Sequence, residues 1–264
     1  MVEDLSTQAF LAAVRRFFAR KGKATDLYSD NATNFVGAKR EIDELHNLIM
    51  SDEPSKIIFS TLASQNINWH FIPPRSPLFG GLWEAAVKSC KHHLIRVVGT
   101  TLLSIEAFLT YLVEIEDILN SRPILPLSSD PNDLKALNPG HFLIGEPLTS
   151  MPEHDLREIA PTRLACWEKS EQMRQHFWSR WYKEYLHTQT VKKKWHTGQP
   201  DVINIDTLVI MKEDNTPPMH WPLARITKIH PGADGIIRVV TVKTTTGEYK
   251  RSIKNLSPLP IDIK

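Results

Sequence analysis

The chain has 264 residues, of which 41% are hydrophobic and 23% are charged, and its formal net charge is +2. This composition excludes a wholly disordered chain, because enough apolar surface is present to offset the entropy lost on folding. No stretch approaches the roughly 20 apolar residues of a membrane-spanning helix. The two cysteines, Cys90 and Cys166, have neither the spacing of a zinc site nor that of a disulfide framework. The first residues mix charge into their apolar run, unlike a signal peptide, so a reducing intracellular location is expected.

The first half of the chain shows patterns typical of both helices and strands. Apolar residues at helical spacing predict a helix in the first 25 residues, with Ser6 or Thr7 as its N-cap and Gly22 at its end. The other predicted elements are two strands and four helices, at 27–29 and 68–72 and at 36–50, 54–66, 82–98 and 104–120.

The second half changes in character. Residues 126–160 are rich in proline and predict a linker or a loosely packed extension. Residues 162–190 predict one helix, whose aromatic side chains recur at helical spacing and favour burial over a platform for stacking bases. The last 60 residues contain short β-type runs separated by turns, which is typical of a small β-barrel. These runs are 207–211, 224–229, 236–242 and 249–253.

Two acidic residues stand out by their position. Asp30 follows a predicted strand, and Glu84 lies in the first turn of a predicted helix. A carboxylate at a strand end and another on a flanking helix can share one site, and such oxygen ligands suit Mg²⁺, which supports phosphoryl transfer. Taken alone, these positions more often hold a turn-forming aspartate and a glutamate that complements the helix dipole.

Longer strings favour the metal-binding interpretation. YSDNATNFVGA at 28–38, WHFIPPRSPLFGGLWEAAVKSCKHHL at 69–94 and ILNSRPI at 118–124 closely resemble the integrase core of BEL/Pao-type LTR retrotransposon polyproteins. Residues 220–260 resemble the small β domain that follows that core. The resemblance covers nearly the whole chain, and its strings occur in the order of the family.

The resemblance implies an α/β fold that combines a partial ribonuclease H-like integrase core with a small SH3-like β-barrel domain. The expected domains are the core at 1–125, a Pro-rich linker at 126–160, a basic amphipathic helix at 161–196 and the barrel at 197–264. In this family three acidic residues bind two Mg²⁺ and integrate DNA by phosphoryl transfer. Asp30 matches the second of these catalytic, metal-binding residues and Glu84 the third.

The resemblance and the charge pattern also indicate DNA-binding residues. Asn31 and Asn34 match the Asp-Asn motif, and the helix that Glu84 opens meets DNA in the family. The residues expected at or near that helix face are Lys88, Lys91 and Arg96. Residues 163–194 carry eight basic and three acidic side chains, ending in the crowded Lys192, Lys193 and Lys194. This charge fits either a solvated helix face or attraction to a DNA backbone.

The terminal β domain and the histidines are less specific. The basic residues of the domain are Arg225, Lys228, Arg238, Lys243, Lys250, Arg251 and Lys254. Small barrels of this kind bind DNA, peptides or chromatin tails, so the fold alone does not choose a partner. We expect the isolated histidines to be surface or packed residues rather than ligands; these are His92, His93 and His141.

The sequence departs from the family pattern in ways that bear on activity. No residue matches the first acidic residue of the family, and the N-terminal His/Cys zinc module is missing. Ala32 stands where the motif usually has glycine, and a positive φ there would strain the turn. We therefore expect weak Mg²⁺ binding and no normal strand transfer by this chain alone.

Two alternatives remain open from the sequence. The chain can be a non-enzymatic protein that binds DNA or chromatin, or a genomic relic without a selected function. The expected location of the protein is intracellular, in the nucleus. Self-association is implied because integrases act as multimers. Neither a membrane nor a small-molecule substrate is indicated as a partner.

Overall fold

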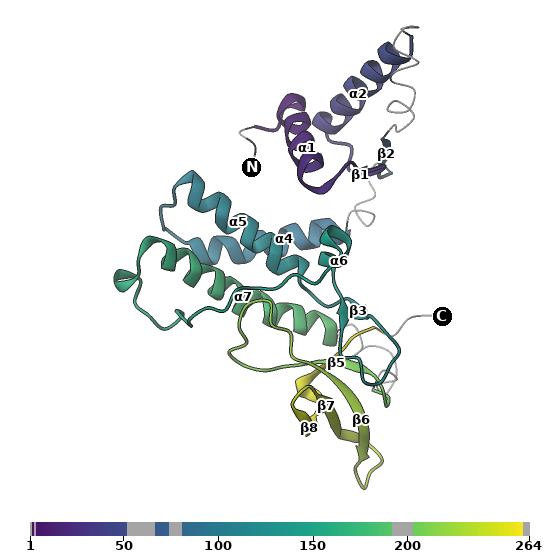
Figure 1. The fold of residues 1–264 in the computed structure, drawn as a ribbon, viewed down its shortest axis with the longest axis vertical. Coiled ribbons are helices and arrows are strands. Elements are labelled where there is room, and N and C mark those ends of the chain that lie inside the picture. The colour runs from purple at the N-terminus through teal and green to yellow at the C-terminus, as the bar shows by residue number, and fades with distance from the viewer. Residues whose placement is uncertain (1, 3, 52–66, 74–80, 192–202, 261–264) are drawn as a thin grey trace. The chain divides into compact units, whose positions relative to one another are not determined.

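The computed structural model describes residues 2, 4–51, 67–73, 81–191 and 203–260. It divides into two compact units, Met1–Lys88 (unit 1) and Ser89–Lys264 (unit 2) (Figure 1). Within the described residues, every helix is too short or too polar to cross a bilayer. The helix predicted at 54–66 lies outside the described residues.

Unit 1 begins with a helix whose two ends follow the sequence prediction. The elements of this unit are α1 (Thr7–Lys21), β1 (Asp26–Ser29), α2 (Thr33–Ser51), β2 (Asn68–Phe71) and the start of α4 (Gly81–Val98). Ser6 Oγ accepts the N–H of Ala9 at 3.1 Å, and Gly22 follows the helix with a φ of 86°. The hydroxyl satisfies an N–H that the first turn leaves unpaired, and glycine tolerates the positive φ without steric cost.

The two strands of unit 1 run parallel, with α2 in the connection between them. Their register runs from Asp26 opposite Asn68 to Ser29 opposite Phe71. Aromatic rings pack α1 against α2 and β2, since the ring centroid of Phe10 lies 4.7 Å from that of Phe35 and 5.9 Å from that of Trp69. A parallel pair of strands joined through a helix is the basic unit of an α/β fold.

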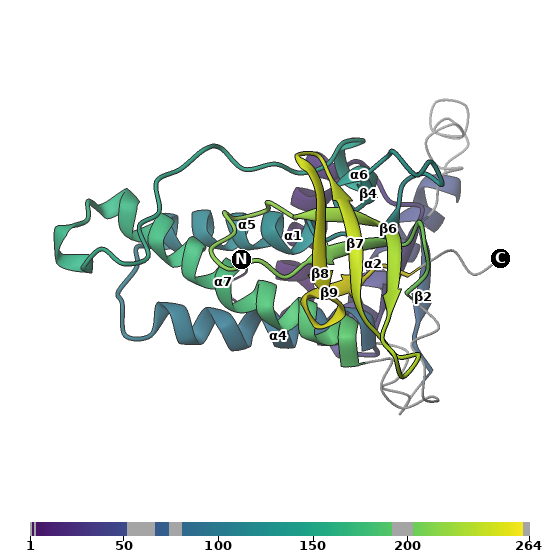
Figure 2. The ribbon, with the colours of Figure 1, turned by 90° about the horizontal axis from the view of Figure 1, so that it is seen from below.

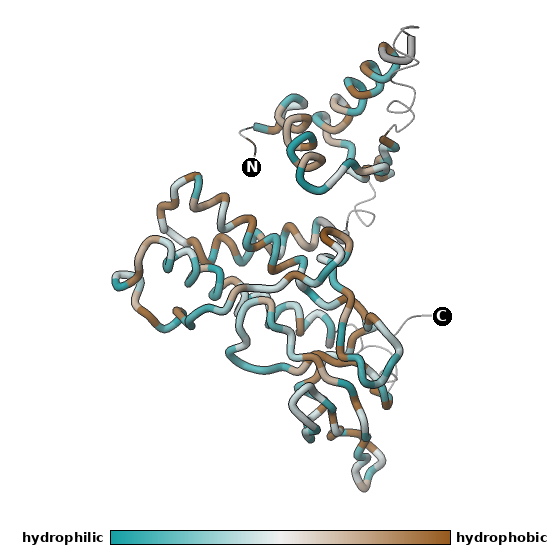
Figure 3. The backbone as a smooth tube through the Cα atoms, viewed as in Figure 1, coloured by the Kyte–Doolittle hydropathy of each residue, from teal (hydrophilic) through white to brown (hydrophobic). Residues whose placement is uncertain are grey.

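Three helices build the core of unit 2: the second part of α4, α5 (Ile105–Asn120) and α7 (Cys166–Val191). Tyr111, Ile115 and Ile118 of α5 are fully or almost fully buried, at the spacing that one face of a helix presents. They belong to the same core cluster as Phe177 and Trp178 of α7. Figure 3 shows hydrophobic stretches along α5 and on the strand β5, where this core lies. The predicted burial of the aromatic stripe is confirmed for most of its members, while Trp167 is exposed.

The last part of unit 2 is a five-stranded antiparallel sheet. Its strands are β5 (Leu208–Met211), β6 (Leu223–Pro231), β7 (Ile237–Thr244), β8 (Gly247–Ser252) and β9 (Leu256–Pro258), in the order β8-β7-β6-β5-β9. Figure 2 shows β6, β7 and β8 side by side. Within the described residues β8 and β9 form the two edges, so the sheet is open rather than closed. The mixed α/β class is confirmed, whereas the ribonuclease H-like core and the SH3-like barrel stay predictions.

Hydrogen bonds attach the sheet to α7. Tyr182 Oη donates to the carbonyl of Met211 at 2.9 Å, and Ser257 Oγ donates to that of Leu186 at 3.4 Å. The Pro-rich stretch before α7 has mostly irregular backbone. Its short elements are β3 (Leu125–Pro126), β4 (Ala136–Leu137), α6 (Pro139–Ile144) and the 3₁₀ turn Pro161–Arg163. The first core cluster of unit 2 combines residues of α5, α7 and β5, and a second cluster is formed mainly by the sheet.

Candidate functional site

Asp30 is the first residue after β1, at the carboxyl end of the parallel pair, and its side chain is exposed. Its Oδ1 accepts the N–H of Ala32 at 2.9 Å, which forms an Asx turn leading into α2. Asn31 Nδ2 donates to the carbonyl of Ile72, the residue after β2, at 2.8 Å. The loop after β1 is thereby tied to the end of β2. Ligands of open α/β sheets bind at this end of the strands.

The other residues of the predicted metal motif lie on two helices. Glu84 is exposed in the first turn of α4, and Asn34 is half-buried in the first turn of α2. Ala32 has no positive φ, so the strain expected from replacing glycine there does not arise. Its carbonyl instead accepts the N–H groups of Phe35 and Val36 at 3.0 and 3.1 Å.

The donor chemistry of Asp30 and Glu84 fits Mg²⁺, which prefers carboxylate oxygens. Residues 74–80, which precede α4, lie outside the described residues. No contact within the described residues joins the two carboxylates. Their sharing of a metal ion therefore stays a prediction, and no reaction step is derived through it.

The predicted basic face of α4 is exposed. Lys88, Lys91 and Arg96 all reach solvent, and the guanidinium of Arg96 lies against the imidazole of His92. Arg96 also donates to the carbonyl of His92 at 3.3 Å. The predicted cluster of Lys192, Lys193 and Lys194 lies outside the described residues.

A carboxylate joins α4 to α7 in unit 2. Glu184 Oε2 lies 2.7 Å from His93 Nε2, and Glu184 Oε1 accepts a hydrogen bond from Ser89 Oγ at 2.7 Å. Burial alone would raise the pKa of Glu184, but the hydrogen bonds from Ser89 and His93 outweigh it and hold the pKa below its usual range. Glu184 is therefore a carboxylate at neutral pH.

The second ring nitrogen of His93 has no such partner. His93 is 6% exposed, and its Nδ1 is buried without a hydrogen-bond partner in the described structure. A doubly protonated ring would bury an unpaired N–H donor at a cost of about 1–3 kcal/mol. The neutral ring, with Nε2–H donated to Glu184, fits these contacts. Ligand atoms of His92, His93 and Glu184 lie within 4.8 Å of one another.

One face of the C-terminal sheet carries a row of basic residues. Lys228 of β6 lies opposite Thr241 of β7, which lies opposite Lys250 of β8, so the three side chains share a face. The two lysines are exposed and Thr241 is buried between them. The opposite face carries Ile226 and Val240, which belong to the second hydrophobic core.

The other end of this face meets the loop before β4. Lys243 Nζ donates to Asn132 Oδ1 at 2.9 Å, and the guanidinium of Arg225 donates to the carbonyls of Asp206 and Asp133 at 2.7 and 2.6 Å. Lys228 and Lys250 are thus the more accessible cations of the face.

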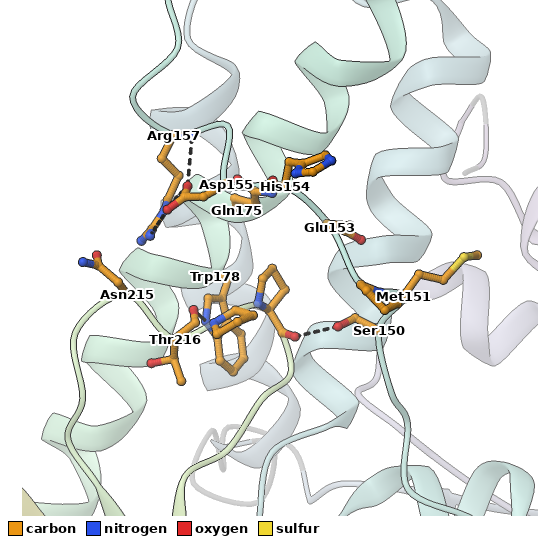
Figure 4. Close-up of a pocket in the computed structure, with 13 residues that line it drawn as sticks. Ser150, Met151, Glu153, His154, Asp155, Arg157, Gln175, Trp178, Asn215 and Thr216 are labelled. Carbon is orange, nitrogen blue, oxygen red and sulfur yellow. Dashed lines mark hydrogen bonds and ion pairs between the residues drawn. The ribbon is translucent and has the colours of Figure 1, made fainter.

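A cavity of about 310 Å³ lies between the Pro-rich stretch, α7 and the loop before β6. Figure 4 shows Trp178 at its wall, with Ser150 donating to the Pro218 carbonyl at 2.8 Å and Asp155 paired with Arg157 at its rim. These two pairs occupy part of the polar lining, and we assign the cavity no ligand.

Sequence reasoning placed Asp30 and Glu84 but missed the Glu184 cluster. The pattern of α4 and α7 shows that each is a helix, but it carries no signal of which residues meet across them. The basic residues of the β domain were recognised, whereas their sharing of one face depends on a register shift between Ile226 and Lys228.

Comparisons with known proteins cover part of the chain. Residues 165–259 match a family described as a family of unknown function (DUF5641). This range spans the whole of α7 and the whole five-stranded sheet. No curated protein matches the sequence. Over α7 and the sheet, the chain is thus similar to a family that has no assigned function.

Proposed function

We propose that the chain is a retrotransposon-derived integrase fragment that binds DNA through its C-terminal sheet and does not catalyse strand transfer by itself. The observation that carries the DNA-binding proposal is the row Lys228–Thr241–Lys250 on the face away from the second core. Neighbouring strands lie about 4.8 Å apart, so the two lysine backbones are separated by roughly 10 Å. Lysine ammonium groups on such a surface neutralise phosphates and release counterions.

The local charge of this face favours a polyanion although the whole chain is nearly neutral. His230 and Lys243 extend the row along β6 and β7, and Glu248 is the acidic residue opposite Lys243. Contacts of this kind attach a protein to the DNA backbone and carry little sequence information. The proposed binding is therefore largely independent of DNA sequence.

The catalytic part of the proposal rests on the sequence strings and on unit 1. The parallel pair with Asp30 at its carboxyl end supports a partial ribonuclease H-like core, and the five antiparallel strands support an SH3-like domain, although their sheet is open. In the ancestral protein, Asp30 and Glu84 would hold Mg²⁺ together with the first acidic residue of the family. The ion would supply Lewis-acid stabilisation of the transferred phosphoryl group. No residue of this chain matches that first acidic residue, so we propose weak Mg²⁺ binding and action in the nucleus as a DNA-binding protein.

The salt dependence of DNA binding tests the proposal. We expect the affinity for a random-sequence duplex to fall steeply as salt rises, by a slope of about 0.9 per phosphate contact on logarithmic axes. The double variant Lys228→Gln/Lys250→Gln should lower this slope by about 2. The double variant Arg20→Gln/Lys21→Gln removes the same charge from the exposed end of α1 and serves as the matched control.

Three results would contradict the proposal. A flat salt dependence, or equal loss of affinity in the two double variants, would exclude the sheet as the DNA-binding face. A strand-transfer product formed by this chain, and still formed after Asp30→Asn, would exclude both the proposed inactivity and the assignment of Asp30 as a metal ligand.

A further inference from the structure

We propose that α4 and α7 of unit 2 form a binding site for a transition-metal ion of the zinc class, with His92, His93 and Glu184 as its ligands. The site is separate from the basic sheet face and from Asp30, and it does not depend on the proposed DNA binding. Its ligand atoms already lie within 4.8 Å of one another.

The geometry needs little movement to accept an ion. Zinc binds imidazole nitrogen and carboxylate oxygen at about 2.0–2.2 Å, so two ligands of a tetrahedral ion lie roughly 3.3 Å apart. His93 Nε2 and Glu184 Oε2 are 2.7 Å apart, with one proton between them. Binding would place the ion between the two atoms, move the ring proton from Nε2 to Nδ1 so that the imidazole stays neutral, and separate the two atoms by about 0.6 Å.

The surroundings of the cluster resemble those of a built site rather than a chance surface pair. Ser89 Oγ donates to the second oxygen of Glu184 at 2.7 Å and so fixes the orientation of the carboxylate. His93 is more than nine-tenths buried, and in the metal-bound ring its Nδ1 would carry a proton without an acceptor in the described structure, a cost that the bonds to the ion must exceed. His92 is exposed, so the ion reaches the cluster from solvent at this residue.

The donor set selects the class of ion. Two imidazoles and one carboxylate suit Zn²⁺ and its neighbours, whereas Mg²⁺ and Ca²⁺ prefer oxygen ligands alone. Three protein ligands leave one tetrahedral position for water or another small ligand. The proposed ion would also join α4 to α7, which the existing hydrogen bonds already do.

Arg96 is the competitor for this site. Its guanidinium lies against both ring nitrogens of His92, and a cation there repels a second cation. Arg96 is exposed and can move into solvent when the ion binds. Removing its charge should therefore strengthen metal binding, a result that a purely structural His93–Glu184 contact does not predict.

The test uses the full chain, purified without a histidine tag and stripped of metal by a chelator. Zn²⁺ is added in a calorimetric titration, and Co²⁺ is used separately for its visible absorption. We expect one high-affinity ion per chain. Ser89→Ala should weaken its affinity by about 10-fold or more, and His92→Ala and Glu184→Gln by more than that. His220→Ala changes an exposed histidine outside the cluster and should leave the affinity unchanged.

Two variants distinguish metal binding at this cluster from a purely structural contact or a loss of folding. His92→Ala leaves the part-buried His93–Glu184 bond in place, so it should fold normally and still lose the site. Arg96→Gln should bind Zn²⁺ at least about three-fold more tightly. The proposal is overturned if wild type binds no more Zn²⁺ than His92→Ala does, or if Arg96→Gln binds it equally or more weakly.

Discussion

Arg174 carries a buried positive charge in α7, where it is 5% exposed. Its guanidinium contacts the carboxylates of Glu153 and Glu171, the latter at 2.9 Å. Burial and a hydrogen bond to Glu171 raise the pKa of Glu153 to about 7. For Glu171, burial is outweighed by hydrogen bonds from Glu153 and Arg174, which hold its pKa below the usual range. Below about pH 7, therefore, Glu153 holds a proton and Glu171 holds the charge.

This arrangement makes stability depend on pH, and Glu153→Gln tests it. Folding raises the pKa of this carboxyl from about 4.5 to about 7. Its contribution to the stability of the folded state is therefore fully present below pH 4.5 and is lost as the pH rises to about 7. Glutamine mimics the protonated form, so the variant should match wild type at pH 4.5 and be more stable at pH 8. The Glu153 side chain is 22% exposed, and after screening the difference should be about 1 kcal/mol.

Thermal unfolding at several pH values measures this difference. Glu158→Gln, at an exposed position five residues away, is the control and should follow wild type at every pH. A constant difference between Glu153→Gln and wild type from pH 4.5 to 8 would contradict the assignment of the proton to Glu153.

At the scale of elements, two glutamines of α7 hold the end of the Pro-rich stretch in place. Gln175 accepts the N–H of Leu156 at 2.9 Å and donates to the carbonyl of His154 at 2.8 Å. Gln172 donates to the carbonyls of Leu156 and Ile159 at 2.7 and 2.6 Å. An irregular segment has no ladder of its own, so these side chains supply the partners that its buried backbone groups need.

Gln175→Leu should release this segment from α7. The buried N–H of Leu156 would lose its acceptor, which costs about 1–3 kcal/mol. We expect faster amide hydrogen exchange at 154–159, together with a lower melting temperature. Lys183→Leu, an exposed change on the same helix, should alter neither quantity. Unchanged exchange at 154–159 in Gln175→Leu would show that other contacts hold the segment.

The sequence predicted helices and strands well where the pattern of residues within one segment is enough to identify the element. The helical spacing of apolar residues indicated α1, α4, α5 and α7, and the side chain of Ser6 marked the start of the first. β9 was missed, because its three residues include Pro258 and it exists as a strand through pairing with β5, about 45 residues earlier. Long-range pairing of this kind leaves no local pattern.

The same limit applies to the sites. Asp30 could be placed at a strand end, because a β-type run directly precedes it. Glu184 gave no such sign, since it meets Ser89 and His93 across more than 90 residues of sequence. From the sequence alone, a charged residue on a helix is interpreted as exposed to solvent. Only the structure shows whether a neighbouring helix packs against it.

At the scale of the whole molecule, the buried apolar side chains are distributed unequally. Among the described residues, Ala38 is the one fully buried hydrophobic residue of unit 1, whereas unit 2 has two core clusters. Parallel strands are usually buried on both faces, yet Tyr28 of β1 is 65% exposed. Unit 1 therefore has less hydrophobic stabilisation for its size, and it should open at a lower free energy than unit 2.

Native-state hydrogen exchange measures the opening of each unit directly. We expect the amides of β1, β2 and α2 to exchange through openings of lower free energy than those of α5, α7, β6 and β7. Phe177→Ala removes a fully buried ring from the first core and should destabilise unit 2 by about 3–5 kcal/mol. If the units unfold independently, exchange in β1 and β2 should not change in this variant. Equal acceleration across both units would show instead that they unfold as one cooperative structure, and that the thin core of unit 1 is stabilised by coupling to unit 2.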